Sequence, residues 1–256
     1  MNWQRMNGPL AAERIGTGRR LVFSHGFTQT ANSWKPVAER LAADGFECVV
    51  VDLPGHGNSS SVRADLRRGA DLLTAVGGPA TYIGYSMGGR FSLHAAVIYP
   101  HLVERMILIG AHPGLDDEDE RSARRNNDDA LAARLAEVGV SMFLDEWLSQ
   151  PIFAGLTISP QERADRERNT IDGLSNSLSL AGTGSQISQW PRLHELSMPI
   201  LFIAGSNDEK FSAVGRQIVD EVLDGKLEVV PYCGHSVVLQ APDEVRNAIL
   251  RFVSND

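Results

Sequence analysis

The sequence predicts an α/β fold in which a doubly wound, mostly parallel sheet carries a helical lid insertion. Three features of the chain indicate it. Apolar, β-branched runs recur along the chain, and they are nearly continuous, as is typical of parallel strands covered on both faces. Segments of helical character separate these runs. Between residues 113 and 190 the strand-like runs stop, and a charged, helical stretch replaces them.

The first half of the chain alternates strands and helices. Gly45 and Pro100 each end a helix-like segment, because glycine favours a helix C-terminus and proline cannot continue a helix. We expect a strand at 20–26, a helix at 33–45, a strand and loop at 47–57, a strand at 80–86, a helix at 87–100 and a strand at 103–112.

Strand-like runs return near the C-terminus, at 199–208 and 226–235, with helices predicted at 209–223 and 241–252. The simplest organisation is one α/β core formed by residues 1–112 and 191–256, with residues 113–190 inserted as a helical lid. Because this insertion follows the end of a strand, we expect it over the edge of the sheet where α/β proteins bind ligands.

Composition excludes several classes of protein. The 256 residues carry a net charge of −8 without a basic face, so nucleic acid is not an expected partner. No apolar stretch approaches the roughly 20 residues of a membrane helix, and the N-terminus lacks a signal peptide, so we expect a cytoplasmic protein without membrane insertion. The two cysteines predict neither a disulfide framework nor a metal site, and no cofactor is expected.

The segment Gly84-Tyr85-Ser86-Met87-Gly88 matches the nucleophile-elbow pattern. A strand that turns sharply into a helix strains the backbone of the serine, and side chains at 84 and 88 would clash. The predicted strand before this segment and the predicted helix after it supply that context. We therefore expect the Ser86 hydroxyl to be exposed at a helix N-terminus.

Asp208 and His235 each follow a later predicted strand. Taken alone, Asp208 is equally well explained as a helix N-cap, and a lone histidine is more often structural. Together the chain order Ser86, Asp208, His235 is that of a hydrolase-type triad. Asp208 would then fix the tautomer of His235, which accepts the serine proton.

The loop after the first predicted strand resembles one that supplies a backbone N–H to an oxyanion hole. The donors would be the amides of Phe27 and Met87. The alternative is a glycine turn with a core phenylalanine. His56, in the loop DLPGHGNS, is interpreted as structural because His235 already holds the position of the base.

At this point the whole chain resembles the α/β-hydrolase superfamily and, more narrowly, the SHCHC synthase (MenH) family of menaquinone biosynthesis. The resemblance rests on GYSMGGR, on DLPGHGNS, on the lid segments ERSARRNNDDALA and FLDEWLSQPIF, on GTGSQ, and on the D-x-K-F form of NDEKF. AGSND lacks the glutamate that often stands two residues before the aspartate.

The resemblance implies a lyase that eliminates pyruvate from SEPHCHC, a compound with three carboxylates. Ser86, driven by His235 and Asp208, would remove a ring proton next to a ketone. The family pattern carries over substrate-binding roles to Tyr85, Arg90, Arg124, Trp147 and Arg168.

A carboxylate-rich substrate needs cations, which arginine supplies well through its planar fork. Arg90 lies one helical turn beyond Ser86. The lid adds further arginines, and the sequence leaves open which of Arg163, Arg166 and Arg168 faces the pocket. The expected partner is a small anionic substrate, bound by a monomer or weak dimer. The acidic run 116–120 is interpreted as a solvated face.

Two other classes of function remain open from the sequence. A carboxylesterase or related small-molecule hydrolase would use Ser86 as a nucleophile through an acyl-enzyme. A ligand receptor could retain the same scaffold without catalysis. Pyruvate release from SEPHCHC, compared with hydrolysis of a simple ester, distinguishes these classes.

Overall fold

The structure is a computed structural model that describes residues 2–254. Its centre is a sheet of eight strands in the order β1-β2-β4-β3-β5-β6-β7-β8. The strands are β1 (Gln4–Met6), β2 (Ala12–Gly16), β3 (Arg20–Ser24), β4 (Glu47–Val51), β5 (Ala80–Tyr85), β6 (Val103–Ile109), β7 (Ile200–Gly205) and β8 (Gly225–Val230).

Strands β3 to β8 pair in parallel, which confirms the predicted sheet. Strands β1 and β2 were not predicted, and they add an antiparallel edge, with β2 pairing to β4. They are short, and both carry charged residues with part of their surface exposed. Such segments lack the continuous apolar run that identifies the buried strands.

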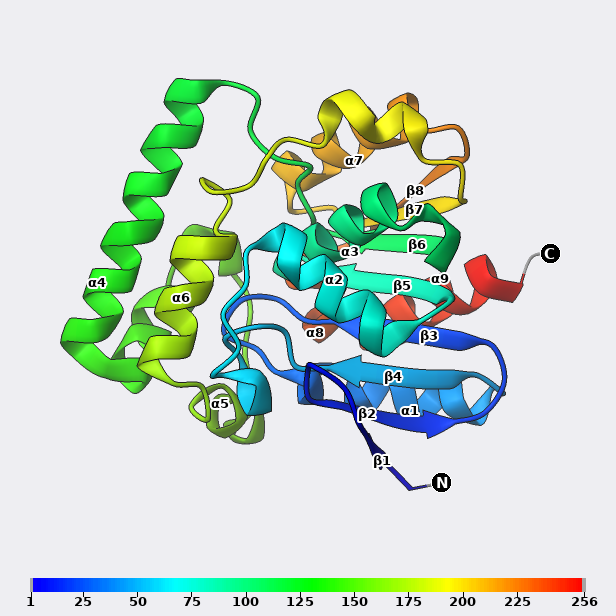
Figure 1. Ribbon diagram of the computed structural model, residues 1–256, viewed down its shortest axis with the longest axis horizontal. Coiled ribbons are helices and arrows are strands. Elements are labelled where there is room, and N and C mark those ends of the chain that lie inside the picture. The colour runs from blue at the N-terminus through cyan, green and yellow to red at the C-terminus, as the bar shows by residue number, and fades with distance from the viewer. Residues whose placement is uncertain (1, 255–256) are drawn as a thin grey trace.

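Helices cover both faces of the sheet (Figure 1). Helices α2 (Leu66–Gly77), α3 (Met87–Ile98) and α7 (Glu209–Glu221) lie on one face, and α1 (Lys35–Ala43) and α9 (Pro242–Ser254) on the other. The short helix α8 (Val237–Gln240) precedes α9.

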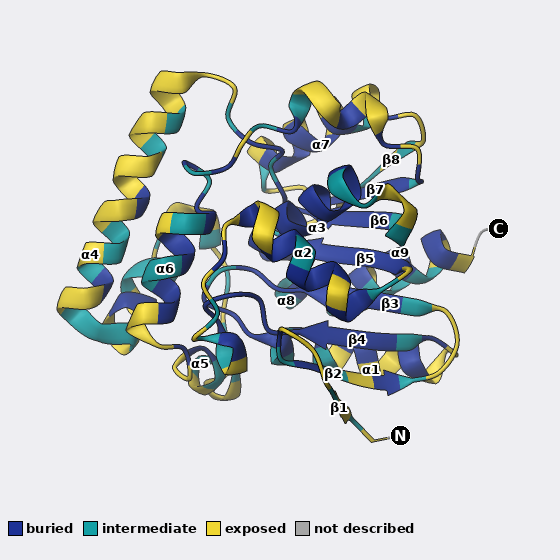
Figure 2. Ribbon diagram, in the orientation of Figure 1, coloured by how far each residue is buried: buried dark blue, intermediate teal, exposed yellow. Residues whose placement is uncertain are grey.

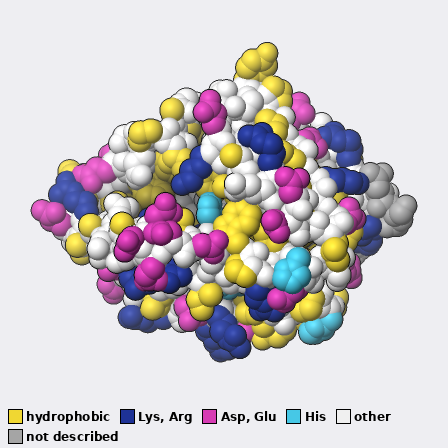
Figure 3. Space-filling view, turned by 90° about the horizontal axis from the view of Figure 1, so that it is seen from above, with side chains coloured by type: hydrophobic (Ala, Val, Ile, Leu, Met, Phe, Trp, Pro, Cys, Tyr) yellow, Lys and Arg dark blue, Asp and Glu magenta, His cyan; other side chains and the backbone are white. Residues whose placement is uncertain are grey.

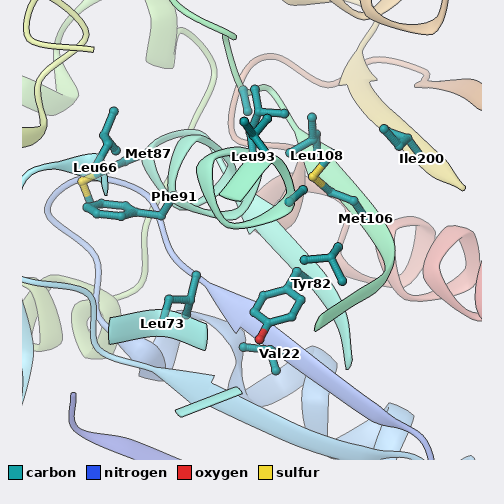
Figure 4. Packing of buried hydrophobic residues seen from close by; sticks show 14 of the residues in the cluster. Val22, Leu66, Leu73, Tyr82, Met87, Phe91, Leu93, Met106, Leu108 and Ile200 are labelled. Atoms are coloured by element: carbon teal, nitrogen blue, oxygen red, sulfur yellow. The ribbon is translucent and has the colours of Figure 1, made fainter. Parts of the chain in front are cut away.

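Two apolar clusters hold these layers together. Along β3, Val22 faces the cluster with α2 and α3, whereas Leu21 and Phe23 face the cluster with α1 and α9. Alternate side chains of a strand point to opposite faces, so a continuous apolar run fills both clusters. The strands are buried and the outer helix surfaces are exposed (Figure 2). Figure 4 shows Tyr82 and Met106 packed in the first cluster.

Residues 113–190, which we call the helical insertion, run between β6 and β7. They contain α4 (Glu118–Leu148), the short 3₁₀ helix η4 (Pro151–Phe153), α5 (Pro160–Arg166) and α6 (Ile171–Ala181). Helix α4 is interrupted at Gly139, where φ is +78°. The three helices stand at the end of the sheet toward which the parallel strands point (Figure 1). The division into core and lid domains stays a prediction.

The surface carries no broad basic field on the face shown in Figure 3, where Lys and Arg alternate with Asp and Glu. Within residues 2–254, no helix combines the length and apolar character needed to cross a membrane. The same residues contain no group of three metal-binding side chains.

Candidate active site

The turn from β5 into α3 exposes Ser86. Its backbone has φ +51°, an uncommon conformation for a residue other than glycine. A Cβ at Gly84 would lie 2.5 Å from the backbone of Gly89, and one at Gly88 would lie 2.2 Å from the carbonyl oxygen of Ser24. Both glycines are therefore required for close backbone packing, as the sequence predicted.

Ser86, His235 and Asp208 form a hydrogen-bonded chain. The Nε2 atom of His235 lies 3.1 Å from Ser86 Oγ, and its Nδ1 lies 2.8 Å from Asp208 Oδ2. The carboxylate favours a proton on Nδ1, which leaves Nε2 free to accept the serine proton. The structure therefore brings together the three side chains that the sequence singled out.

Asp208 also caps a helix. Its Oδ1 accepts a hydrogen bond of 3.2 Å from the Phe211 amide at the start of α7, while Oδ2 faces His235. Asp208 thus caps the helix and also contacts His235, so the two interpretations of this residue do not exclude each other. Because one oxygen is held by the helix backbone, the other is fixed in its direction toward the imidazole.

The imidazole of His235 is enclosed by side chains and is only 4% exposed. The ring of Phe211 lies 4.6 Å away between centroids, and that of Tyr85 lies 5.5 Å away. This apolar enclosure limits water around the imidazole and strengthens its hydrogen bonds to Asp208 and Ser86.

Phe27 sits in a four-residue turn from Gly26 to Gln29. The Gly26 carbonyl oxygen accepts hydrogen bonds from the Gln29 amide (3.2 Å) and from Nδ1 of His25 (2.8 Å). The Phe27 N–H belongs to the same planar peptide and points the opposite way, so its direction follows that of the Gly26 carbonyl. Phe27 and Met87 both line the cavity at Ser86. Their amides have no acceptor among the described residues.

Thr28 occupies the third position of this turn with φ +68°. Turns that require a positive φ at this position favour glycine or asparagine, and a β-branched residue there is strained by about 1–3 kcal/mol. Thr28 is fully buried, so the surrounding structure must hold this conformation. Nothing in the residues around Thr28 predicts this strain.

His25 and His56 lie together beneath this turn as neutral residues, with ring centroids 5.0 Å apart. Burial lowers the pKa of His25 to about 4 and that of His56 to about 3. Nε2 of His25 accepts a hydrogen bond from the Leu53 amide, which requires the unprotonated atom. His56 contacts the ring of Phe27 and not Ser86, which agrees with a structural role.

A cavity of about 190 Å³ opens beside Ser86 and His235. The core and the helical insertion both line it, and it contains three cationic side chains, Arg90, Arg124 and Lys210. The only carboxylate among the described lining residues is Asp128. The lining therefore carries an excess of positive charge next to the serine.

The three cations differ in how they are held. Arg90 donates from Nη1 to the carbonyl of Ala181 (2.6 Å), and burial together with Arg124 lowers its pKa to about 10. Arg124 donates from Nε to the buried carboxylate of Asp128 (2.8 Å). Lys210 has no carboxylate within ion-pair distance among the described residues.

Two residues predicted to bind substrate, Tyr85 and Arg168, lie outside this cavity. The Tyr85 ring packs against Gly26, and its hydroxyl hydrogen-bonds Ser236 Oγ at 3.0 Å. Strand β5 turns this side chain into the core, where it is buried. Arg168 is 43% exposed and pairs with Asp165 (2.7 Å). Neither side chain lines the cavity, whereas Arg90, Arg124 and Trp147 do.

The two neighbouring arginines also point elsewhere. Arg163 pairs with Asp145 and Glu167 on the surface of the helical insertion. Arg166 is buried and donates to Thr28 Oγ1 (2.6 Å). None of the three arginines left open by the sequence lines the cavity in this structure.

Sequence reasoning missed Lys210, although it lies within the D-x-K-F motif that the resemblance quoted. Its position two residues after Asp208 at the start of α7 was the available signal. Phe153 in η4 and Asp128 in α4 were also missed. Their side chains reach the cavity only through the packing of the helical insertion, which the sequence does not specify.

Comparison with known proteins agrees with this geometry. Residues 21–248 match the family model described as "Alpha/beta hydrolase family". A Klebsiella pneumoniae protein named 2-succinyl-6-hydroxy-2,4-cyclohexadiene-1-carboxylate synthase is 30% identical, over 88% of this chain and 90% of its own. A Bacillus subtilis (strain 168) protein, which bears the same enzyme name as a provisional assignment, is 32% identical, over 97% and 93%.

Solved structures agree as well. MenH from S. aureus superposes with a TM-score of 0.87 and 28% identity, covering 98% of this chain and 97% of its own. An esterase from Exiguobacterium antarcticum has a TM-score of 0.80 at 19% identity, over 98% and 99%, and shows the fold alone. The chain therefore belongs to the alpha/beta hydrolase family and, within it, to the MenH-type proteins.

Proposed function

We propose that this protein is a carbon–oxygen lyase that eliminates pyruvate from SEPHCHC to give SHCHC in menaquinone biosynthesis. One observation carries the proposal beyond the family. The hydrogen-bonded chain of Ser86, His235 and Asp208 opens into a cavity whose lining includes three cations and one carboxylate. A substrate with several carboxylates matches that charge.

In this reaction Ser86 Oγ removes the ring proton next to the ketone, while His235 Nε2 takes the hydroxyl proton. Negative charge develops on the ketone oxygen. The amides of Phe27 and Met87 would stabilise it, since a preorganised donor acts most strongly on a developing charge. The enolate carbonyl then re-forms, its electrons shift through the ring to make a new double bond, and the C–O bond to the enolpyruvyl group breaks. The departing enolpyruvate takes the proton held by His235 and leaves as pyruvate.

Arg90, Arg124 and Lys210 are the residues proposed to bind the substrate carboxylates, and Trp147 would contact its apolar part. Arg90 already donates one N–H to the Ala181 carbonyl, which fixes the guanidinium while leaving other N–H groups for a ligand. The cavity is smaller than the roughly 300–1,000 Å³ of common ligand pockets, so substrate entry requires the helical insertion to move outward.

The helical insertion would then act as a lid. The proposal also includes a cytoplasmic protein that acts as a monomer or weak dimer on a small molecule without a cofactor. Cys48 and Cys233 are both buried and unpaired, which suits a reducing compartment.

The experiment that tests the function is direct. Purified protein is incubated with SEPHCHC, and pyruvate release is followed together with the intact mass of the protein. We expect turnover without a mass increase at Ser86. The same distance from Ser86 to His235 would also suit acylation. Rapid hydrolysis of p-nitrophenyl acetate with an acyl-enzyme, and no pyruvate, would establish a hydrolase instead.

A further inference from the structure

The turn that carries Phe27 is held by the helical insertion as well as by the core. The Nδ2 atom of Asn169 donates to the carbonyl oxygen of Thr28 at 2.7 Å. Nη1 of Arg166 donates to Thr28 Oγ1 at 2.6 Å. The hydroxyl and the carbonyl of the strained residue are therefore bound to Arg166, the last residue of α5, and to Asn169, in the loop before α6.

The amide of Asn169 has a defined orientation. Its Oδ1 accepts a hydrogen bond of 2.8 Å from the Gly57 N–H, and a second bond from Nδ2 goes to the Arg166 carbonyl (3.0 Å). Since Gly57 supplies a donor, the oxygen must face it, and the NH₂ group must face Thr28. Asn169 is 4% exposed, so water does not compete for these bonds.

Other contacts between the helical insertion and the core gather at the same turn. The ring of Phe27 contacts Trp147 of α4, with centroids 5.0 Å apart. Asp165 accepts hydrogen bonds from Thr30 and from Asn32 Nδ2, the latter at 2.6 Å. The position of the insertion is thus coupled to the loop that follows β3.

We infer that Asn169 and Arg166 are positioning residues that hold Thr28 in its left-handed conformation and so aim the Phe27 N–H into the cavity. A threonine resists that conformation, because its branched Cβ crowds the backbone. When the helical insertion moves outward, these bonds to Thr28 break and the turn relaxes. The oxyanion hole is then complete only when the insertion is docked. The use of SEPHCHC turnover as a readout rests on the proposed function, whereas the coupling between the insertion and the turn does not.

The first test compares Asn169→Ala and Asn169→Asp with wild type. Asn169→Asp keeps the acceptor for Gly57 but loses the donor to Thr28. We expect kcat with SEPHCHC to fall about tenfold or more in both variants, because the Phe27 donor is misdirected but not removed. KM should stay within about threefold of wild type. Arg134→Ala, which breaks an ion pair to Glu146 within α4, is the matched control and should retain kcat.

A second test removes the backbone strain at Thr28. Glycine adopts a positive φ without strain, so Thr28→Gly makes the turn less dependent on Asn169. We expect Asn169→Ala to lower kcat by no more than about threefold in that background, a non-additivity that reports coupling. Equal losses from Asn169→Ala in both backgrounds would overturn the inference.

The third measurement needs no substrate. Amide hydrogen exchange of residues 26–29 should speed up about tenfold or more in Asn169→Ala and remain unchanged in Arg134→Ala. If wild type releases no pyruvate, the proposed function fails, while this exchange still decides the coupling. Unchanged exchange in Asn169→Ala would contradict it.

Discussion

The sheet core and the helical insertion are stabilised by different interactions. Strand residues such as Phe23, Ile83 and Phe202 are fully buried in two apolar clusters. Helix α4 spans 31 residues but buries only Asp128, Leu135, Phe143 and Leu144. Its surface carries ion pairs such as Arg134–Glu146. Surface ion pairs add little stability, so the insertion depends on a small apolar contact and on polar bonds to the core.

The difference separates two tasks. The core supplies Ser86, His235 and Asp208 from strand ends and helix starts that packing holds firmly. The insertion supplies Arg124 and Trp147, which line the cavity from α4. Under the proposed function, the core would transfer the proton and the insertion would cover the site.

Stability gives the largest expected contrast between the two regions. Phe23→Ala should lower the free energy of unfolding by about 3–5 kcal/mol, because it leaves a cavity in the buried sheet. Phe143→Ala, in the small apolar cluster that Phe143 forms with Leu135 and Leu174 inside the insertion, should cost less in global stability but should speed proteolysis within α4. Urea unfolding and limited proteolysis measure the two effects. Equal global losses would show that the insertion is part of the same cooperative unit.

Substrate binding compares the two regions through the cationic residues that each contributes to the cavity. Lys210→Met, from the core, should raise KM for SEPHCHC about tenfold, with kcat changing less. Arg124→Ala, from the insertion, should raise KM more, because it also leaves the buried Asp128 carboxylate uncompensated. Steady-state kinetics measures both. Lys226→Met, at an exposed site outside the cavity, is the control, and a similar KM increase there would refute specific carboxylate binding.

The loss of stability at acid pH should originate in the core, because every histidine lies outside residues 113–190. Burial lowers the pKa values of His25 and His94 to about 4 and that of His56 to about 3, below the usual histidine pKa of 6.5. The unfolded chain then binds more protons, so stability is full above pH 6.5 and is lost as pH falls toward 4. Each histidine contributes a slope of up to about 1.4 kcal/mol per pH unit.

Urea unfolding between pH 7.5 and 4.5 tests this slope, and His94→Gln should flatten it. On α4 and beside α5, the pKa values of Asp145 and Glu167 are lowered instead, because arginine hydrogen bonds favour the charged form, whereas burial raises the pKa of Glu162. Those interactions persist until the pH falls below the usual carboxyl range. Proteolysis within α4 should therefore change little from pH 7.5 to 5.5, and a steep change would contradict this assignment.

Much of the fold was predictable because burial leaves a signal in the sequence. The runs that form β3 to β8 are continuously apolar, and the glycines around Ser86 mark a turn that sterics demand. The hydrogen-bonded arrangement of Ser86, His235 and Asp208 was predictable from residue type and chain order together. Strands β1 and β2 left no such signal, since they are short and partly exposed.

Side-chain direction was less predictable. Tyr85 adjoins Ser86 in the chain and Arg168 lies in the insertion, yet the Tyr85 ring packs against Gly26 and the Arg168 side chain is largely exposed. Lys210 reaches the cavity from a motif whose lysine carried no assigned role. Such directions depend on packing between distant segments, and sequence spacing alone does not determine them.

The central claim is that the Ser86 hydroxyl transfers a proton beneath a cationic cavity. Pyruvate release from SEPHCHC by wild type and by Ser86→Ala, with Ser149→Ala as an exposed control, tests it most directly. We predict turnover by wild type and control, and a loss of about 10³–10⁴-fold in kcat for Ser86→Ala with its fold intact. Full pyruvate release by Ser86→Ala would contradict the account.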